Sequence, residues 1–249
     1  MYLMLVPTQI EFDTSKYRSI SDSEKDSIDE IYESVKGYKT VNVYDKLKEK
    51  TDDYIYFRTD HHWTQRGAYC GYEALMEAKG IEPVPLENLE HRKIEGFLGY
   101  LYNQANDKDY KKYADDIEYF SVGRNYTILA KGKGSSGRVD TYTTMLYCPP
   151  EGEAPTYDLF MGGNHGMLEI NTGIENGETA LIIKDSYGNT VIPLLTNHYE
   201  RIFVVDPRMF GSTIDDIVTF CDVDDIIFLN YIFSTTFDDF IDYIDDVMK

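Results

Sequence analysis

The sequence has 249 residues, of which 42% are hydrophobic, and it contains 22 tyrosines and 12 phenylalanines. This length and composition fit one large α/β domain or two small ones and argue against a disordered chain. The formal net charge is −20, from 44 acidic and 24 basic residues. It disfavours nucleic acid and anionic membrane surfaces as partners, because both require clustered lysine and arginine.

The N-terminal stretch MYLMLVPTQIEF predicts a buried strand over residues 2–6. It lacks the basic start and the small-residue cleavage site of a signal peptide. Nor does the sequence contain a run of about 18 apolar residues that would predict a membrane-spanning helix. We expect natural sequence that includes an export anchor to precede Met1. No pair of the three cysteines has metal-ligand spacing. They permit at most one disulfide and leave one thiol over, so they do not indicate a redox compartment.

Capping residues, apolar periodicity and terminal glycines predict the elements that follow. In chain order these are a helix within 19–37, a short strand at 40–44, a strand at 53–59 and a helix at 64–80. Proline and glycine then punctuate the sequence up to about residue 177, and short aromatic segments predict strands there. These strands are expected at 116–122, 126–132 and 143–148, with a hairpin-like loop at 132–140.

Regular α/β alternation returns from residue 179, beginning with the nearly all-apolar segment TALIIKD. We expect strands at 179–185, 201–206 and 224–232 and helices at 189–199, 212–221 and 234–249. Strands that alternate with helices indicate a mostly parallel sheet flanked by helices. We therefore predict a single α/β domain over 1–249, with a β-rich insertion at about 81–177 that frames the functional site.

Ligand sites in open parallel sheets lie outside the carboxyl ends of the strands. The strand at 54–57 ends at Asp60, His61, His62 and Trp63, and the strand at 180–184 ends at Lys184, Asp185, Ser186, Tyr187 and Gly188. The strand at 201–205 ends at Asp206, Pro207 and Arg208, and the strand at 225–229 ends at Asn230. An aspartate, a histidine and a serine thus converge on one edge of the predicted sheet. This set of side chains performs nucleophilic acyl transfer.

The roles of these three residues follow from their chemistry. A serine hydroxyl needs a base, and a neutral imidazole at His62 can accept its proton near pH 7. Asp60, two residues before His62, can fix the imidazole tautomer through Nδ1–H. A sharp strand-to-helix turn after the apolar strand would expose Ser186 Oγ and aim backbone N–H groups at a developing oxyanion.

Other interpretations of the same residues stay open. Ser186 can simply cap a helix, His62 can be a buried structural histidine, and Trp63 can belong to the core or to a cleft wall. Metal binding is the rival use of the Asp-His-His sequence. Adjacent side chains in an extended segment point opposite ways, so we expect His61 to face away from Asp60 and His62. A zinc site would then need His91, His165 or His198 to join, and no spacing predicts this, so no metal and no cofactor is expected.

Two segments carry a resemblance to a known family: TDHHWT at 59–64, which precedes a predicted helix, and IIKDSYGN at 182–189. They resemble the bacterial DHHW protein family, which is similar to the SGNH-hydrolase-like domains of the alginate O-acetylation proteins. In those domains an Asp-x-His-Trp motif precedes the serine, an order permuted relative to ordinary SGNH esterases. The resemblance covers most of the chain and implies Asp60 as the orienting acid, His62 as the base and Ser186 as the nucleophile.

Ordinary SGNH enzymes supply oxyanion donors from a glycine and an asparagine on later loops. Asn230 occupies the position of that asparagine, whereas Asn164 lies in the insertion ahead of the serine strand. We therefore rank the Ser186 backbone N–H and Asn230 above Asn164. The remaining candidates for oxyanion or substrate binding are Arg208, Tyr187 and Trp63.

The resemblance implies a serine esterase or O-acetyltransferase that acts on acetylated cell-surface or extracellular polysaccharide, in an extracytoplasmic location. It also implies polysaccharide or acetylated sugar as substrate and a membrane-bound acetyl-transfer partner. The alternative is a non-catalytic glycan-binding or polysaccharide-assembly module on the same fold. An intact Asp60, His62 and Ser186 set favours the enzyme. The sequence leaves open whether water or a sugar accepts the acyl group.

Overall fold

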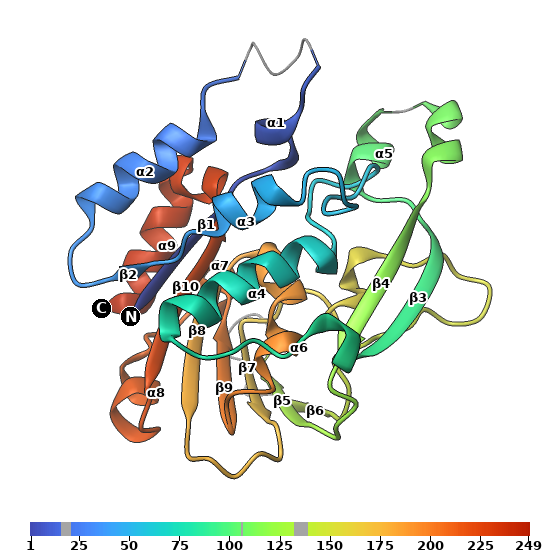
Figure 1. Ribbon diagram of the computed structural model, residues 1–249. Helices are drawn as coiled ribbons and strands as arrows, with labels where there is room; N and C mark the ends of the chain where they lie inside the picture. Colours follow the sequence, from blue (N-terminus) through green and yellow to red (C-terminus); the bar gives the residue numbers. More distant parts are fainter. Residues whose placement is uncertain (16–20, 106, 132–138) are drawn as a thin grey trace.

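The computed structural model describes residues 1–15, 21–105, 107–131 and 139–249 (Figure 1). Most of the predicted hairpin-like loop at 132–140 therefore lies outside the described residues. The helices are α1 (Gln9–Phe12), α2 (Glu24–Ser34), α3 (Val43–Glu49), α4 (Gln65–Lys79), α5 (Tyr100–Ala105), α6 (Ile192–Leu195), α7 (Pro207–Phe210), α8 (Asp215–Phe220) and α9 (Asp238–Met248). Within these ranges no helix has the length and apolar character needed to cross a membrane.

The strands are β1 (Tyr2–Val6), β2 (Lys39–Thr40), β3 (Glu90–Phe97), β4 (Asp115–Ser121), β5 (Thr127–Lys131), β6 (Val139–Tyr142), β7 (Met167–Asn171), β8 (Thr179–Lys184), β9 (Arg201–Val205) and β10 (Asp225–Tyr231). In the described part of the chain, the larger sheet has eight strands in the order β2-β1-β10-β8-β9-β7-β5-β6. The strands from β2 to β9 in this order run parallel, and β7, β5 and β6 continue the sheet antiparallel. The predicted mostly parallel sheet flanked by helices is confirmed.

Strand β8 lies between β10 and β9 in the parallel part and is buried along its whole length. Its side chains alternate between two cores. Ala180 and Ile182 join the core that includes α3, α4 and α6, whereas Leu181 and Ile183 pack with α8 and α9. Figure 1 shows α4 and α6 in front of the central strands. A strand covered on both faces must be apolar throughout, which explains the sequence TALIIK.

The region predicted as a β-rich insertion contributes to two sheets. Its strands β5, β6 and β7 extend the main sheet beyond β9, and β3 and β4 pair into a separate antiparallel ribbon (Figure 1). The predicted strands at 116–122 and 126–132 correspond to β4 and β5. The strand predicted at 143–148 is wrong, because this segment forms only an isolated bridge between Leu146 and Phe160. That the insertion frames the site and belongs to one domain stays a prediction.

Two predictions near the N-terminus are also wrong. The strand predicted at 40–44 is present only at Thr40, the end of β2, and Val43 and Tyr44 already belong to helix α3, which Asn42 caps by accepting a hydrogen bond from the Asp45 backbone N–H at 3.3 Å. The strand predicted at 53–59 is an irregular loop whose pairing is limited to a bridge between Tyr56 and Trp63. The helix predicted at 64–80 is confirmed as α4, which begins after Thr64 and ends at Gly80 in the left-handed conformation.

Candidate active site

The loop that carries the Asp-His-His-Trp sequence is held in place by a carboxylate from β4. Asp115 is buried, and it accepts hydrogen bonds from the Thr59 backbone N–H at 2.8 Å and from the Thr59 hydroxyl at 2.5 Å. The Phe57 N–H donates to the His62 carbonyl at 3.2 Å and closes the loop on itself. Helix α4 then starts at Gln65, directly after its N-cap Thr64. The loop is therefore fixed at both ends, and its central side chains are presented in one orientation.

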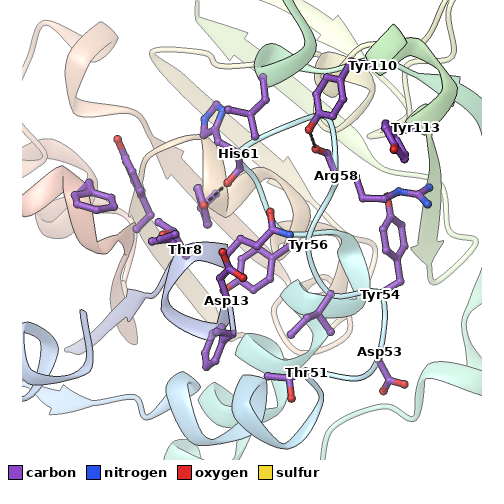
Figure 2. Close-up of a pocket in the computed structure, with 18 of the residues that line it drawn as sticks. Thr8, Asp13, Thr51, Asp53, Tyr54, Tyr56, Arg58, His61, Tyr110 and Tyr113 are labelled. Atoms are coloured by element: carbon purple, nitrogen blue, oxygen red, sulfur yellow. Dashed lines mark hydrogen bonds between the residues drawn. The ribbon is translucent and has the colours of Figure 1, made fainter. Parts of the chain in front are cut away.

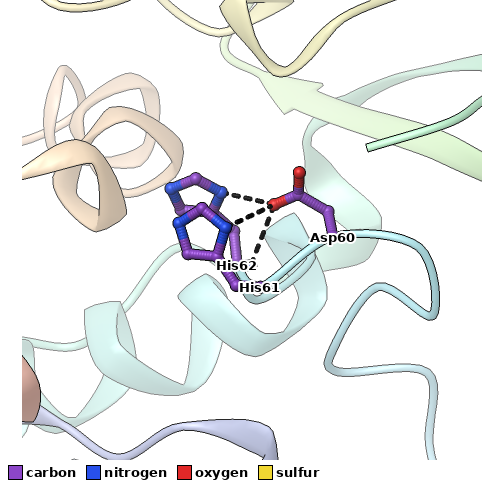
Figure 3. Close-up of side chains that lie close together, drawn as sticks. All are labelled: Asp60, His61 and His62. Atoms are coloured by element: carbon purple, nitrogen blue, oxygen red, sulfur yellow. Dashed lines mark hydrogen bonds and ion pairs between the residues drawn. The ribbon is translucent and has the colours of Figure 1, made fainter. Parts of the chain in front are cut away.

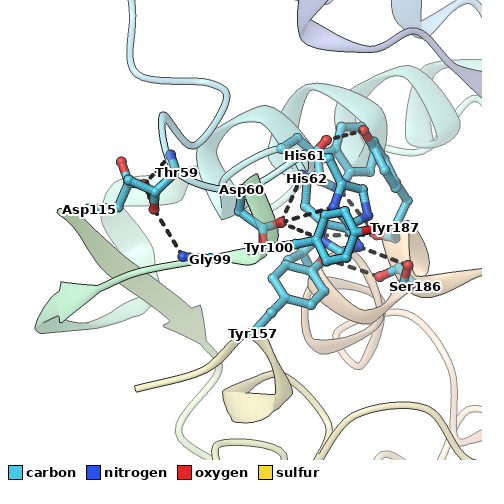
Figure 4. A network of polar contacts seen from close by, with 12 residues as sticks. Thr59, Asp60, His61, His62, Gly99, Tyr100, Asp115, Tyr157, Ser186 and Tyr187 are labelled. Carbon is cyan, nitrogen blue, oxygen red and sulfur yellow. Dashed lines mark hydrogen bonds and ion pairs between the residues drawn. The ribbon is translucent and has the colours of Figure 1, made fainter. Parts of the chain in front are cut away.

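Asp60, His62 and Ser186 form a continuous chain of hydrogen bonds (Figure 4). The carboxylate oxygen Oδ1 of Asp60 lies 2.5 Å from His62 Nδ1, and His62 Nε2 lies 2.8 Å from Ser186 Oγ. Asp60 is also fixed by two backbone donors, the N–H of His62 at 3.0 Å and the N–H of Tyr100 at 2.7 Å. A carboxylate on Nδ1 leaves Nε2 as the basic nitrogen, which faces the serine hydroxyl.

Ser186 begins a short 3-10 turn, η5 (Ser186–Thr190), directly after β8 and Asp185. Asp185 caps this turn, because its Oδ1 accepts the Tyr187 N–H at 2.9 Å. Its Oδ2 accepts from the Tyr231 N–H at 2.9 Å and from the Ser234 hydroxyl at 2.7 Å, and so connects the turn to the end of β10. Ser186 itself is partly exposed, while its neighbours are buried. This is the strand-to-turn geometry expected for an accessible hydroxyl.

Tyr157, from the insertion, is a site residue that the sequence analysis missed. Its ring stacks on the imidazole of His62 with a centroid distance of 3.7 Å and an interplanar angle of 7°. Its hydroxyl donates to the Ser186 carbonyl at 3.1 Å. Tyr157 therefore holds both His62 and Ser186. With 22 tyrosines in the chain and no motif around this one, the sequence carried no signal for it.

The orientation predicted for His61 is wrong. Its ring lies beside that of His62 with a centroid distance of 3.9 Å, and its Nδ1 is 3.7 Å from Asp60 Oδ1 (Figure 3). The segment is a tight loop and not an extended strand, so neighbouring side chains need not point opposite ways. Asp60, His61 and His62 offer ligand atoms within 4.8 Å of one another, a spacing that can hold a metal ion. The hydrogen bonds to Asp60 and Ser186 occupy both ring nitrogens of His62.

The residues predicted for oxyanion or substrate binding are all held by hydrogen bonds. Trp63 is fully buried, and its Nε1 donates to the Tyr187 carbonyl at 3.0 Å, which fixes the loop to the serine turn. The Tyr187 hydroxyl donates to the His61 carbonyl at 2.5 Å. Asn230 is buried, and its Nδ2 donates to Asp185 Oδ2 at 3.3 Å. The Arg208 guanidinium pairs with Asp206 through two hydrogen bonds, at 2.8 and 2.6 Å.

Asn164, ranked below Asn230, contacts both ends of the segment that carries Ser186. Its Oδ1 accepts from Lys184 Nζ at 2.8 Å and from Asn189 Nδ2 at 3.2 Å. An ammonium group can only donate, so Lys184 fixes the Asn164 amide with its oxygen toward Lys184. Within the described residues, Asn189 Oδ1 is a buried acceptor without a hydrogen-bond partner.

The family model described as DHHW protein matches residues 1–205. The chain belongs to the DHHW family. Among solved structures it is similar to a DHHW family protein from Eubacterium siraeum, with a TM-score of 0.90 and 28% identity over 100% of this chain and 82% of that one. No curated protein matches the chain.

The DHHW chain is also similar to PatB1 of Bacillus cereus, with a TM-score of 0.78 and 18% identity over 96% of this chain and 85% of that one. PatB1 with a sulfonyl adduct gives the same TM-score at 16% identity, over 100% of this chain and 86% of that one. These likenesses confirm the predicted SGNH-like fold. The O-acetyltransferase domain of Pseudomonas putida AlgJ matches at a TM-score of 0.48 and 11% identity, over 98% of this chain and 82% of that one, too weakly to carry an argument.

Burial sets the electrostatics of the two ionisable partners of Ser186. Burial lowers the pKa of His62 to about 4, although the hydrogen bond that His62 donates to Asp60 opposes this shift. Burial alone would raise the pKa of Asp60, but its hydrogen bond to His62 and the charge of His62 lower that pKa to about 2. At neutral pH this DHHW protein therefore holds a neutral imidazole against an ionised carboxylate, as a general base requires.

The low pKa of His62 predicts the pH dependence of serine activation. Only neutral His62 can accept the Ser186 proton, and this form is lost as the pH falls through the pKa of about 4. We expect kcat/KM for an aryl acetate to be level from about pH 5 to pH 7 and to fall about tenfold per pH unit below the pKa. A pH–rate profile tests this. An acid limb near the ordinary histidine pKa of about 6.5 would contradict the effect assigned to burial.

Proposed function

We propose that this DHHW protein is a serine esterase or O-acetyltransferase that acts on acetylated cell-surface or extracellular polysaccharide through an acyl-enzyme. The observation that carries the proposal is the position of His62, with one ring nitrogen on Asp60 and the other 2.8 Å from Ser186 Oγ. A histidine that merely supported the core would need no carboxylate on one side and a partly exposed serine on the other.

In the proposed reaction Ser186 Oγ attacks the carbonyl carbon of an acetyl ester while its proton passes to His62 Nε2. Asp60 stabilises the imidazolium that forms. The tetrahedral intermediate collapses, His62 returns the proton to the leaving alcohol, and the acetyl group remains on Ser186. Water or a sugar hydroxyl then attacks this ester, and His62 takes its proton; His62 returns the proton to Ser186 Oγ as the acetyl group leaves on the acceptor. Water as acceptor makes the protein an esterase, and a sugar makes it a transferase.

The oxyanion of each intermediate needs donors beside Ser186. We assign this role to the Ser186 backbone N–H at the start of the turn. The N–H of Tyr187 and the Nε1 of Trp63 already donate to Asp185 and to the Tyr187 carbonyl, respectively. Arg208 and Asn230 remain the proposed lining residues, because their hydrogen bonds to Asp206 and Asp185 leave further N–H groups on both side chains, and the Nδ2 of Asn164 is added to them.

The setting proposed for this chemistry is extracytoplasmic. Polysaccharide acetyl esters on the cell surface are the substrates, and a membrane-bound protein is the proposed source of acetyl groups if the protein is a transferase. The net charge of −20 agrees with a substrate other than nucleic acid.

We expect the purified protein to turn over an aryl acetate slowly and to carry one acetyl group on Ser186 when the reaction is quenched. Mass spectrometry of the peptide that contains Ser186 detects this intermediate. A sulfonyl fluoride should inactivate the protein by modifying the same side chain. Adding oligosaccharide acceptors separates the two acceptor classes, because a transferase releases the aryl alcohol faster and forms an acetylated sugar.

A chelator provides the control, because the cluster of Asp60, His61 and His62 has a spacing that suits a metal ion. Metal-assisted hydrolysis would be abolished by the chelator and would leave Ser186 unmodified. That outcome would reject the serine mechanism. A folded protein without turnover on any acetyl ester would favour the glycan-binding or polysaccharide-assembly module.

A further inference from the structure

A cleft of about 1050 Å³ opens beside the three-residue site (Figure 2). Its walls come from the α1 turn, from the loop before the Asp-His-His sequence, from the α5 region and from the segment after β10. Two of its lining residues, His61 and Tyr187, directly follow Asp60 and Ser186 in the sequence. The His61 ring lies beside the His62 ring with a centroid distance of 3.9 Å, so the cleft lies next to the candidate site.

Aromatic rings form much of the cleft wall. Phe12, Tyr54 and Tyr56 lie on the side of α1 and the loop that follows α3, and Tyr110 lies across from them (Figure 2). At the rim, Tyr113 is 46% exposed, Phe233 38% and Phe237 53%. Exposed rings around a cleft present flat apolar faces to a ligand. The C–H faces of sugar rings pack on such faces, while sugar hydroxyls reach polar groups such as Thr8, Gln9 and Thr51.

The charges in the cleft discriminate between kinds of sugar. Among the described lining residues, Asp13 and Asp53 are acidic, and Arg58 and His61 are basic. Arg58 is already paired, because its Nε donates to Asp115 Oδ1 at 3.1 Å. A chain of uronic acids would bring one negative charge per sugar into a cleft whose described lining has two carboxylates and an arginine already paired with Asp115, on a protein of net charge −20.

We propose that this cleft binds the sugar chain that gives or receives the acetyl group, and that the chain consists of uncharged sugar residues; this inference rests on the proposed function. The aromatic rim supports successive rings of the chain. The end at His61 and Tyr187 brings one sugar hydroxyl or its acetyl ester toward Ser186.

Binding is measured by calorimetry with the Ser186→Ala protein, so that no turnover disturbs the titration. The probes are hexasaccharides of glucose, mannose, galactose and N-acetylglucosamine, and hexauronates as the charged counterparts. We expect at least one uncharged chain to bind and the hexauronates to bind more weakly. Tighter binding of hexauronates, or binding of none of the uncharged chains, would overturn the proposal.

Ring substitutions locate the binding. In the same background, Phe237→Ala should weaken binding of the best uncharged chain about fivefold to tenfold, the loss expected for one stacking ring. The matched control is Phe220→Ala, because Phe220 is 77% exposed on α8 and does not line the cleft. Equal affinities of these two variants would place the sugar elsewhere and reject the assignment. Circular dichroism checks that both variants are folded.

A charge variant tests the second half of the proposal. Asp13→Asn combined with Asp53→Asn should strengthen hexauronate binding severalfold and leave the uncharged chain within about twofold. An unchanged hexauronate affinity would contradict the charge argument. Aryl acetate turnover by the parent protein is measured in parallel. Sugar binding without turnover would reject the serine chemistry alone, and turnover without sugar binding would reject the cleft assignment alone.

Discussion

Ser186→Ala is expected to lower kcat for hydrolysis of an aryl acetate by a factor of about 10⁴ or more, leaving the fold intact. The substitution removes Oγ, which lies 2.8 Å from His62 Nε2, and so removes the atom that would carry the acetyl group. His62→Ala should lose nearly as much, because either change disables the same proton transfer. The double variant should be no worse than either single variant. Steady-state kinetics with matched thermal unfolding curves measure all three.

The neighbouring residues provide graded controls for this prediction. Asp60→Asn should cost less than His62→Ala, because it misorients the imidazole without removing it. His61→Ala should have a mild effect on a small aryl ester, since the proton path runs through His62. A metal mechanism would order these variants differently, with His61 and His62 equally important and Ser186 dispensable. Activity retained in Ser186→Ala would therefore disprove the serine assignment.

The position of Ser186 was predictable because it depends on the parallel sheet, whereas Asp60 and His62 lie on a loop and were identified by their sequence motif. The run TALIIKD identified a strand buried on both faces, and the carboxyl end of such a strand is where ligands bind. The structure brings the three side chains within hydrogen-bond distance. Their catalytic roles stay a prediction until the kinetics are measured.

The wrong strand prediction at 53–59 shows that a local apolar pattern does not determine strand pairing. Ile55, Tyr56 and Phe57 are buried, as a strand would require. The segment nevertheless has no strand beside it. Its backbone pairs with residues a few positions later, as in the Thr64 N–H that donates to the Ile55 carbonyl at 2.9 Å. A short apolar run shows burial but not the partner that would make it a strand. The wrong orientation of His61 follows from the same error.

The contacts of Tyr157 and Asp115 could not be predicted for a different reason. Both residues belong to the region 81–177 and meet the site only through the tertiary fold. Asp115 fixes Thr59, 56 positions earlier in the sequence, and Tyr157 reaches Ser186, 29 positions later. No periodicity or spacing in the sequence encodes contacts over such separations. Sequence motifs identified the candidate reacting groups, whereas the residues that hold these groups in place could be identified only from the structure.

Asp185→Ala is expected to destabilise the protein by about 3–5 kcal/mol, a large part of the roughly 5–15 kcal/mol that typically stabilises a domain. Asp185 is 1% exposed, and its oxygens accept from the N–H groups of Tyr187 and Tyr231 and from Ser234 Oγ. Alanine would leave these buried donors unsatisfied, and each costs about 1–3 kcal/mol. Urea unfolding followed by circular dichroism measures the loss as a lower midpoint at constant slope.

Asp242→Ala is the matched control for this substitution, because Asp242 is an exposed carboxylate on α9. It should change the free energy of unfolding by no more than about 0.5 kcal/mol. Burial raises the pKa of Asp185 from its ordinary value, so Asp185→Asn separates charge from hydrogen bonding. The amide keeps one acceptor oxygen but turns an NH₂ group toward donors, so it should recover only part of the lost stability. Full recovery by asparagine would show that one acceptor oxygen is enough, and a loss below about 1 kcal/mol in Asp185→Ala would show that Asp185 does not hold the Ser186 turn.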